Sequence, residues 1–92
     1  MTVADEAALL AQLHAALAQT ARGRLDDATR EVAVADLHVT FTQRAEGPLR
    51  MQGRITGGGR SVCFCEAEAH DAQGRLVARA MGTFRYRGAS AG

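Results

Sequence analysis

The chain has 92 residues, which is the size of one small domain. A monomer of this size buries a small share of its surface on folding, so we expect burial against a partner chain to stabilise it. Its formal net charge of +1 and its aromatic content of 4% argue against binding to nucleic acid or to an anionic membrane surface. No apolar run approaches membrane-spanning length, and Asp5 and Glu6 stand where a secretory signal carries basic residues, so we expect a cytoplasmic protein.

Residues from about 5 to 22 are predicted to form one amphipathic helix. Apolar residues recur at spacings of three and four and form a single stripe of Leu9, Leu10, Leu13, Ala16, Leu17 and Ala21. Local propensity agrees with this pattern because the segment is rich in Ala and Leu, and Gly23 is a natural stop.

The remainder of the chain alternates with period two, which predicts strands at about 31–42, 48–56, 61–70 and 75–87. Within the first of these strands the apolar residues change parity between Val34 and Leu37. A β-bulge near Ala35 or Asp36 would reconcile the two halves of the strand.

Small residues occupy one face of each of the last two strands: Cys63, Cys65, Ala67 and Ala69, and then Leu76, Ala78, Ala80 and Gly82. A hairpin turn near Gln73-Gly74 would place both sets on the same side of the sheet. The other side would carry charges able to pair across strands, namely Glu66, Glu68, Arg79 and Arg85. The sequence therefore predicts an α+β fold in which the helix lies on a floor of small side chains.

Four short motifs follow one another along the chain: V-A-D-L-H-V-T-F at residues 34–41, G-R-S-V-C-F at 59–64, D-A-Q-G-R-L-V-A at 71–78 and G-T-F at 82–84. They are similar to the T-V-D-L-x-V-x-F, G-R-x-x-x-F, D-x-x-G-x-L-V-A and G-T-F motifs of one protein family. In this order and spacing, they make the chain resemble the hotdog-fold acyl-CoA thioesterases of the phenylacetate-pathway type.

The resemblance runs from about residue 9 to residue 86 and implies a single hotdog domain over residues 1–92 that lacks the family's first strand. This domain has one central helix on an antiparallel sheet of about four strands. The resemblance also implies a CoA ester as ligand and no metal or organic cofactor. Family members usually pair through the strand predicted here at 31–42, so a homodimer or homotetramer is expected. The strand at 49–55 should expose the edge that the family's first strand covers.

The resemblance places catalysis on the helix, where a family Asp or Glu acts on the thioester while a Gly N–H before the helix polarises its carbonyl. Framed by the family's L-x-D pattern, this chain has Ala15 where the acid belongs. Val34 replaces a hydroxyl residue, and the H-G-G loop expected before the helix is absent. We therefore expect a relative of acyl-CoA thioesterases with impaired or no catalysis. The alternative is a non-catalytic module for acyl or CoA binding, or for homodimerisation.

His14 is the candidate for a substitute general base, because an unperturbed imidazole titrates near neutral pH. It is rotated by about 100° around the helix from the acid position, and a solvent-side or interface histidine is the simpler interpretation. The turn containing Gly58, Gly59 and Arg60 is the candidate substrate-binding segment. Its backbone N–H groups could hold a CoA phosphate with Arg60 as the charge partner, although such turns also occur without a ligand.

Cys63 and Cys65 with His70 could suggest a metal site. Two thiolates on one strand fall short of the four ligands of a structural zinc site. We therefore expect no metal, and we interpret the cysteines as small, reduced residues that face the helix.

Overall fold

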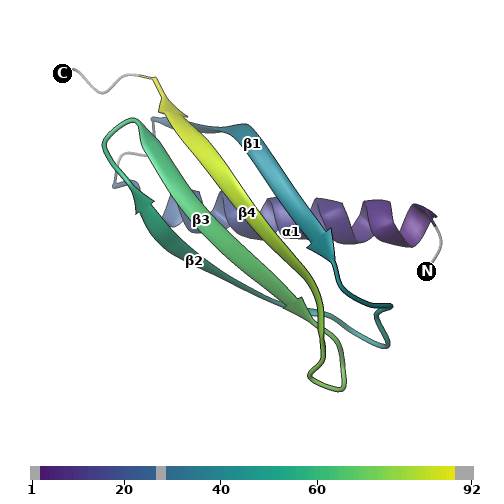
Figure 1. The fold of residues 1–92 in the computed structure, drawn as a ribbon. Coiled ribbons are helices and arrows are strands. Elements are labelled where there is room, and N and C mark those ends of the chain that lie inside the picture. The colour runs from purple at the N-terminus through teal and green to yellow at the C-terminus, as the bar shows by residue number, and fades with distance from the viewer. Residues whose placement is uncertain (1–2, 27–28, 89–92) are drawn as a thin grey trace.

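The protein consists of one helix laid across a four-stranded antiparallel sheet (Figure 1). The computed structural model describes residues 3–26 and 29–88, and for residues 3–5 it describes the backbone alone. The elements in chain order are α1 (Val3–Gly23), β1 (Glu31–Phe41), β2 (Arg50–Gly58), β3 (Val62–His70) and β4 (Leu76–Arg87). The predicted α+β arrangement is confirmed.

The sheet has the strand order β1-β4-β3-β2, so β1 and β2 are its edges within the described residues. The register between β1 and β4 shifts between Val34 and Asp36, which confirms the predicted bulge and makes Ala35 the extra residue. A second register shift, between Ile55 and Gly57, lies within the pairing of β2 with β3. No change of apolar parity announces this second bulge in the sequence.

The end of β2 differs from the prediction, because the strand continues through Gly57 to Gly58 instead of ending near residue 56. Gly58 has a φ of 131°, and a Cβ atom there would overlap the carbonyl oxygen of Val62. Only glycine combines this backbone conformation with so close an approach. The strand therefore extends into the segment that the sequence suggested as a turn.

The helix buries one stripe against the sheet. Leu9, Leu13, Leu17 and Ala21 are each at most 2% exposed and recur every four residues. Leu10 was predicted in the same stripe, but it is 39% exposed, so the prediction was wrong for this residue. Its side chain leaves the helix about 100° from that of Leu9, which turns it away from the floor.

Small side chains form the floor beneath α1, as predicted. Ala67 of β3 lies opposite Ala80 of β4, and both are fully buried. The helix comes equally close to β2, where a Cβ atom on Gly53 would overlap Oγ1 of Thr20. Side chains of ordinary size at these positions would push the helix off the sheet.

The opposite face of the sheet is charged, as predicted. Arg79 of β4 pairs with Glu68 of β3 at 3.0 Å, which confirms one cross-strand pair. Glu66 pairs instead with Arg54 of β2 at 2.6 Å, because β4 places Met81 opposite Glu66. Exposed pairs of this kind contribute about 0–1 kcal/mol each, so the buried face dominates the stability.

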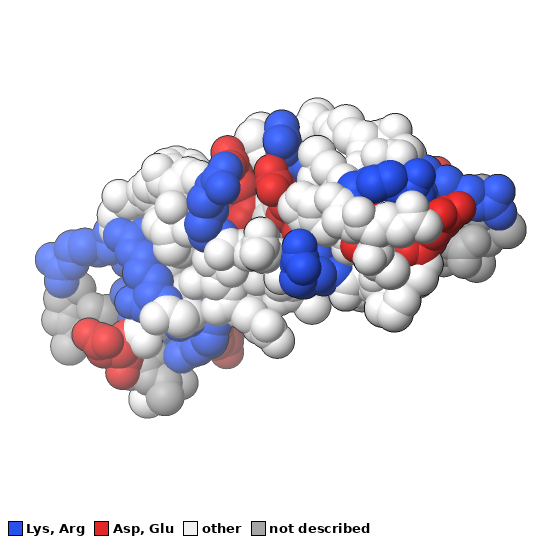
Figure 2. Space-filling model, turned by 90° about the horizontal axis from the view of Figure 1, so that it is seen from below, with Lys and Arg blue, Asp and Glu red and all other residues white. Residues whose placement is uncertain are grey.

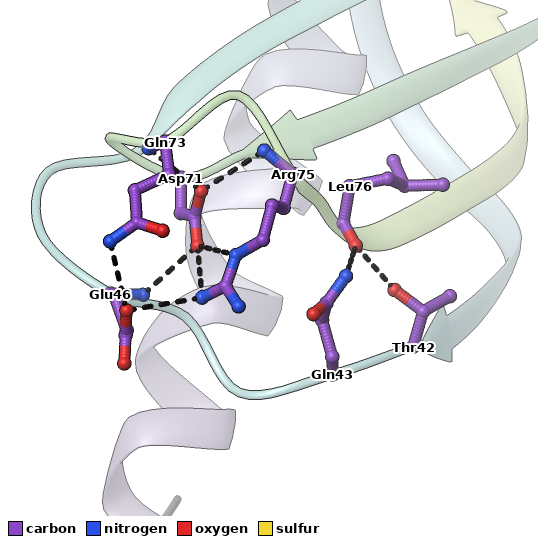
Figure 3. Close-up of polar contacts among 7 residues, drawn as sticks. All are labelled: Thr42, Gln43, Glu46, Asp71, Gln73, Arg75 and Leu76. Carbon is purple, nitrogen blue, oxygen red and sulfur yellow. Dashed lines mark hydrogen bonds and ion pairs between the residues drawn. The ribbon is translucent and has the colours of Figure 1, made fainter.

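A buried carboxylate fastens the β1–β2 loop to the β3–β4 turn (Figure 3). Asp71, which is 4% exposed, accepts hydrogen bonds from the backbone N–H groups of Gln73 and Arg75 at 2.9 and 3.0 Å. The Arg75 guanidinium donates to it at 3.0 and 2.8 Å, and the N–H of Glu46 in the β1–β2 loop donates at 3.4 Å. Burial acts to raise the pKa of Asp71, but the hydrogen bonds from Arg75 and Gln73 outweigh it and lower the pKa to about 2.

Candidate functional site

Ala15, which occupies the helix position where an acid was expected, has an exposed side chain. His14 is exposed as well, and its ring stacks on Phe84 of β4 with the centroids 6.3 Å apart and the planes 15° apart. Val34 lies opposite Phe84 in the register of β1 and β4. The structure therefore brings His14 and Val34 to the same core residue, whereas Ala15 leaves the helix in another direction.

The middle of the helix offers no carboxylate for proton transfer. From Ala7 to Gly23 the sequence contains neither Asp nor Glu. The methyl group of Ala15 can neither accept a proton nor position a water molecule. The imidazole of His14 is thus the one side chain in this part of α1 with a ring nitrogen that could accept a proton.

A hollow of about 330 Å³ lies between the N-terminal half of α1 and the β1–β2 loop that Asp71 fastens. Its lining consists of Ala8, Leu9, Gln12, Arg44, Ala45, Gly47 and Leu49. This volume is at the lower end of the range of small-molecule pockets. Its polar side chains, Gln12 and Arg44, cannot act as a general base at neutral pH, so the hollow could hold part of a ligand without reacting with it. Neither residue was predicted from the sequence.

The Gly58–Arg60 segment lies toward the C-terminal end of α1. The N–H of Gly59 donates to the carbonyl of Val62 at 2.8 Å, so this group closes the turn instead of facing a ligand. Arg60 is exposed. The backbone contribution expected of this turn is thereby reduced, and the Arg60 guanidinium is the group that remains able to hold an anion.

Two further arginines, which the sequence analysis did not single out, come close to Arg60. Arg24 donates from Nη1 to the carbonyl of Val62 at 3.2 Å. Arg30 donates to the carbonyls of Arg60 and Tyr86 at 3.2 and 3.3 Å. Figure 2 shows basic side chains gathered at this end of the molecule, with some acidic ones beside them. A hollow of about 320 Å³ here is lined by Arg24, Leu25, Arg30, Gly59, Arg60 and Tyr86.

The cysteines and His70 lie on opposite faces of the sheet. Cys63 and Cys65 are free and buried under α1, whereas His70 lies 3.9 Å from Glu68 on the charged face. Burial, together with the neighbouring Cys63, raises the pKa of Cys65 to about 11, so its thiol stays protonated at neutral pH. Within residues 3–26 and 29–88, no group of three or more His, Cys, Asp or Glu is placed to hold a metal ion.

An apolar patch lies beside the free edge of β1. We call Leu10, Val34 and Phe41 the edge patch; they are 39%, 42% and 38% exposed. Leu10 lies one helical turn from Glu6, and Glu6 and Phe41 line the same hollow. Leu10 also lies one turn from His14, which stacks on Phe84, the residue opposite Val34. Large apolar residues exposed beside an unpaired strand are typical of an interface between chains.

No helix formed by the described residues is long and apolar enough to cross a membrane. Residues 1–78 match the family model of the thioesterase superfamily. The comparison with curated proteins found no match.

Solved structures share the fold. A Bacillus halodurans protein crystallised with CoA is 23% identical, with a TM-score of 0.79 over 85% of this chain and 55% of that one. A phenylacetic acid degradation-related protein from Ralstonia eutropha JMP134 is 29% identical, with a TM-score of 0.76 over 84% and 58%. A mutant thioesterase from Staphylococcus aureus is 14% identical, with a TM-score of 0.83 over 89% and 69%. The chain thus spans little more than half the length of the first two proteins.

Proposed function

Because the chain belongs to the thioesterase superfamily, we propose that it is a homodimeric protein that binds acyl-CoA and hydrolyses the thioester slowly or not at all. Its hotdog fold is the one that the similar solved structures share. The observation that carries the proposal is the alanine at position 15 of the helix.

A family member uses a helix carboxylate to position or activate the attacking water. Loss of a general acid or base typically lowers a rate by about 10²–10⁴-fold. Ala15 supplies no such group, and no carboxylate follows it on the helix to take over. The proposed protein therefore keeps the binding surface of the family while its chemical step is slow.

His14 is the remaining candidate for a base, but its position argues against the role. The imidazole stacks on Phe84 instead of occupying the direction of the Ala15 side chain. A base must lie within hydrogen-bond reach of the attacking water. We therefore assign His14 to the neighbourhood of the edge patch and not to catalysis.

The proposed dimer joins two copies through β1. Its outer edge has no partner strand among the described residues, and the edge patch lies beside it. Antiparallel pairing of two β1 strands would satisfy the edge N–H and C=O groups and bury Val34 and Phe41. A tetramer would need a second surface. The exposed Phe64 and Met81, which are 44% and 47% exposed, offer one.

Within the Gly58–Arg60 segment predicted for this role, the proposed CoA contact is the Arg60 side chain, because the N–H of Gly59 already donates to the carbonyl of Val62. A structurally similar Bacillus halodurans protein was crystallised with CoA, which supports CoA as the ligand class. The two buried cysteines are free, which supports a reducing, cytoplasmic location.

The proposal is tested by measuring thiol release from a panel of acyl-CoA esters alongside CoA binding by calorimetry. We expect binding with turnover close to background. Ala15→Asp should raise the turnover, because it returns a carboxylate to the acid position. Ala11→Asp, one helical turn earlier at another exposed alanine, is the control and should not raise it.

Two results would contradict the proposal. Ready turnover that His14→Ala abolishes would make His14 the base and the protein an active enzyme. Failure to bind any CoA species, with the dimer intact, would favour the alternative of a pure homodimerisation module, for which the edge patch is the supporting observation.

A further inference from the structure

Three arginines line one hollow, and among the described residues no Asp or Glu lines it. Arg24 comes from the segment after α1, Arg30 from the residue before β1, and Arg60 from the β2–β3 turn. Among the described residues, no ion pair joins any of the three to an acidic side chain. Asp26 and Glu31 belong to the same part of the chain but do not line the hollow.

Neutral groups hold the side chains of Arg24 and Arg30 in place. Backbone carbonyls of Arg60, Val62 and Tyr86 accept their hydrogen bonds. The guanidinium carbons of Arg24 and Arg30 also lie 6.0 and 5.5 Å from the centroid of the Tyr86 ring, within the range of a cation–π interaction. Such partners fix the positions of the arginines without neutralising their charge.

Like charges held together repel one another, and a bound anion relieves this repulsion while accepting charge-assisted hydrogen bonds. The Nε atom of Arg30 is buried and has no hydrogen-bond partner among the described residues, so the cluster retains donor capacity. Arg60, whose side chain is exposed, also lines the hollow. The arrangement is that of an anion site in which hydrogen bonds to carbonyl groups hold two arginines, Arg24 and Arg30, and Arg60 supplies a third.

We propose that Arg24, Arg30 and Arg60, together with the Tyr86 ring, bind a phosphate monoester, and that in the proposed CoA ligand this group is the 3′-phosphate of the ribose. A phosphate monoester carries about −1.5 to −2 charges on three acceptor oxygens, whereas each unit of a diphosphate diester carries one charge. Three planar guanidiniums suit the more highly charged group. This inference rests on the proposed function for the identity of the ligand, but not for the existence of the anion site.

The test compares the affinities of CoA and dephospho-CoA, which lacks only the 3′-phosphate, by calorimetry on the full chain. CoA should bind roughly 10–100-fold more tightly, the gain expected when hydrogen bonds to a charged group are formed. Arg60→Gln and Arg24→Gln should weaken CoA binding and bring the two ligands to nearly equal affinity. Arg50→Gln is the matched control, because Arg50 is an exposed arginine at the other end of the sheet.

The variants are compatible with folding, because Arg60 and Arg24 are exposed. An independent measurement uses inorganic phosphate as the probe. Tyr86 is the only tyrosine of the chain and there is no tryptophan, so its fluorescence reports on the hollow directly. Phosphate should change this fluorescence in the wild type and in Arg50→Gln, but not in Arg60→Gln.

The outcomes separate this inference from the proposed function. Equal affinities for CoA and dephospho-CoA that Arg24→Gln leaves unchanged would overturn the inference and leave CoA binding intact. If CoA and dephospho-CoA bind equally well and Arg60→Gln and Arg24→Gln weaken the binding of both ligands, the arginines contact the diphosphate. This result would also overturn the inference of a 3′-phosphate site. A fluorescence response to phosphate that depends on Arg60, with no CoA binding, would support the anion site while contradicting the proposed ligand.

Discussion

The hydroxyl of Tyr86 donates a 2.7 Å hydrogen bond to the carbonyl of Ala21. This bond ties the last strand to the last turn of α1, and the ring that makes it also contacts Arg24 and Arg30. One side chain therefore joins the hydrophobic core to the basic end of the molecule.

Tyr86→Phe should lower the free energy of unfolding by about 0.5–1.5 kcal/mol, the usual contribution of one hydrogen bond. The Ala21 carbonyl keeps a second donor, the N–H of Arg24 at 3.3 Å, so a larger loss is not expected. Denaturant unfolding at neutral pH measures the change. A loss of several kcal/mol would show that the hydroxyl does more than bind this carbonyl.

The same variant should change the stability of the protein in alkali. Burial raises the pKa of Tyr86 to about 12, above its ordinary value of about 10. A raised folded-state pKa stabilises the protein fully below pH 10, and this contribution disappears as the pH rises through 12. The stability difference between wild type and Tyr86→Phe should therefore shrink across this range. Tyrosinate absorbance gives the pKa directly, because the chain has one tyrosine.

Gly53→Ala should destabilise the protein by about 1–3 kcal/mol, because the new methyl group would overlap Oγ1 of Thr20. Adding Thr20→Ala should recover part of this loss, since the helix backbone and the remaining atoms leave room for the methyl group. Gly59→Ala is the control, because a Cβ atom there has no neighbour within 4 Å. Simple additivity of Gly53→Ala and Thr20→Ala would refute the contact.

Asp71→Asn should remove an acid-dependent part of the stability. The lowered pKa of Asp71 stabilises the folded state above the ordinary value of about 4, and this contribution is lost as the pH falls through about 2. Wild type and variant should thus converge in stability between pH 4 and pH 2. Unfolding curves at several pH values measure this. A constant difference over the window would mean that the carboxylate charge is not what holds the β1–β2 loop.

Val34→Asp should weaken the proposed dimer on the order of 100-fold, because a carboxylate would be buried at an apolar contact. Sedimentation equilibrium measures the dissociation constant. Ile55→Asp is the matched control on β2, the other edge strand, where the side chain is 40% exposed. A dimer that Ile55→Asp dissociates and Val34→Asp leaves intact would place the interface at the β2 edge.

Local patterns were sufficient for most of the fold. The spacing of Leu9, Leu13 and Leu17 predicted the buried stripe of α1, and the change of parity after Val34 predicted the bulge of β1. Both patterns arise from the period of a single element and need no knowledge of its neighbours. The bulge after Ile55, in which Thr56 is the extra residue, was missed because Gly57 and Gly58 beyond it have no side chains to reveal the change of face.

The candidate site was less predictable. The motif at residues 59–64 pointed to Arg60, but it gave no sign of Arg24 and Arg30. These two residues lie between α1 and β1, far from Arg60 in the sequence, and they line the same hollow. The N–H of Gly59, expected to face a phosphate, closes its own turn instead. A motif specifies which groups a segment carries, whereas their remaining bonding capacity depends on what the folded chain places beside them.

By itself, the sequence determined the helix, the four strands and the floor of small side chains, because periodicity and side-chain volume act within each element or between adjacent ones. Only the tertiary structure decided that Leu10 stays exposed near β1, that Asp71 fastens two loops, and that three arginines meet around Tyr86. These relationships depend on how the helix crosses the sheet, a geometry set by all the close contacts acting together.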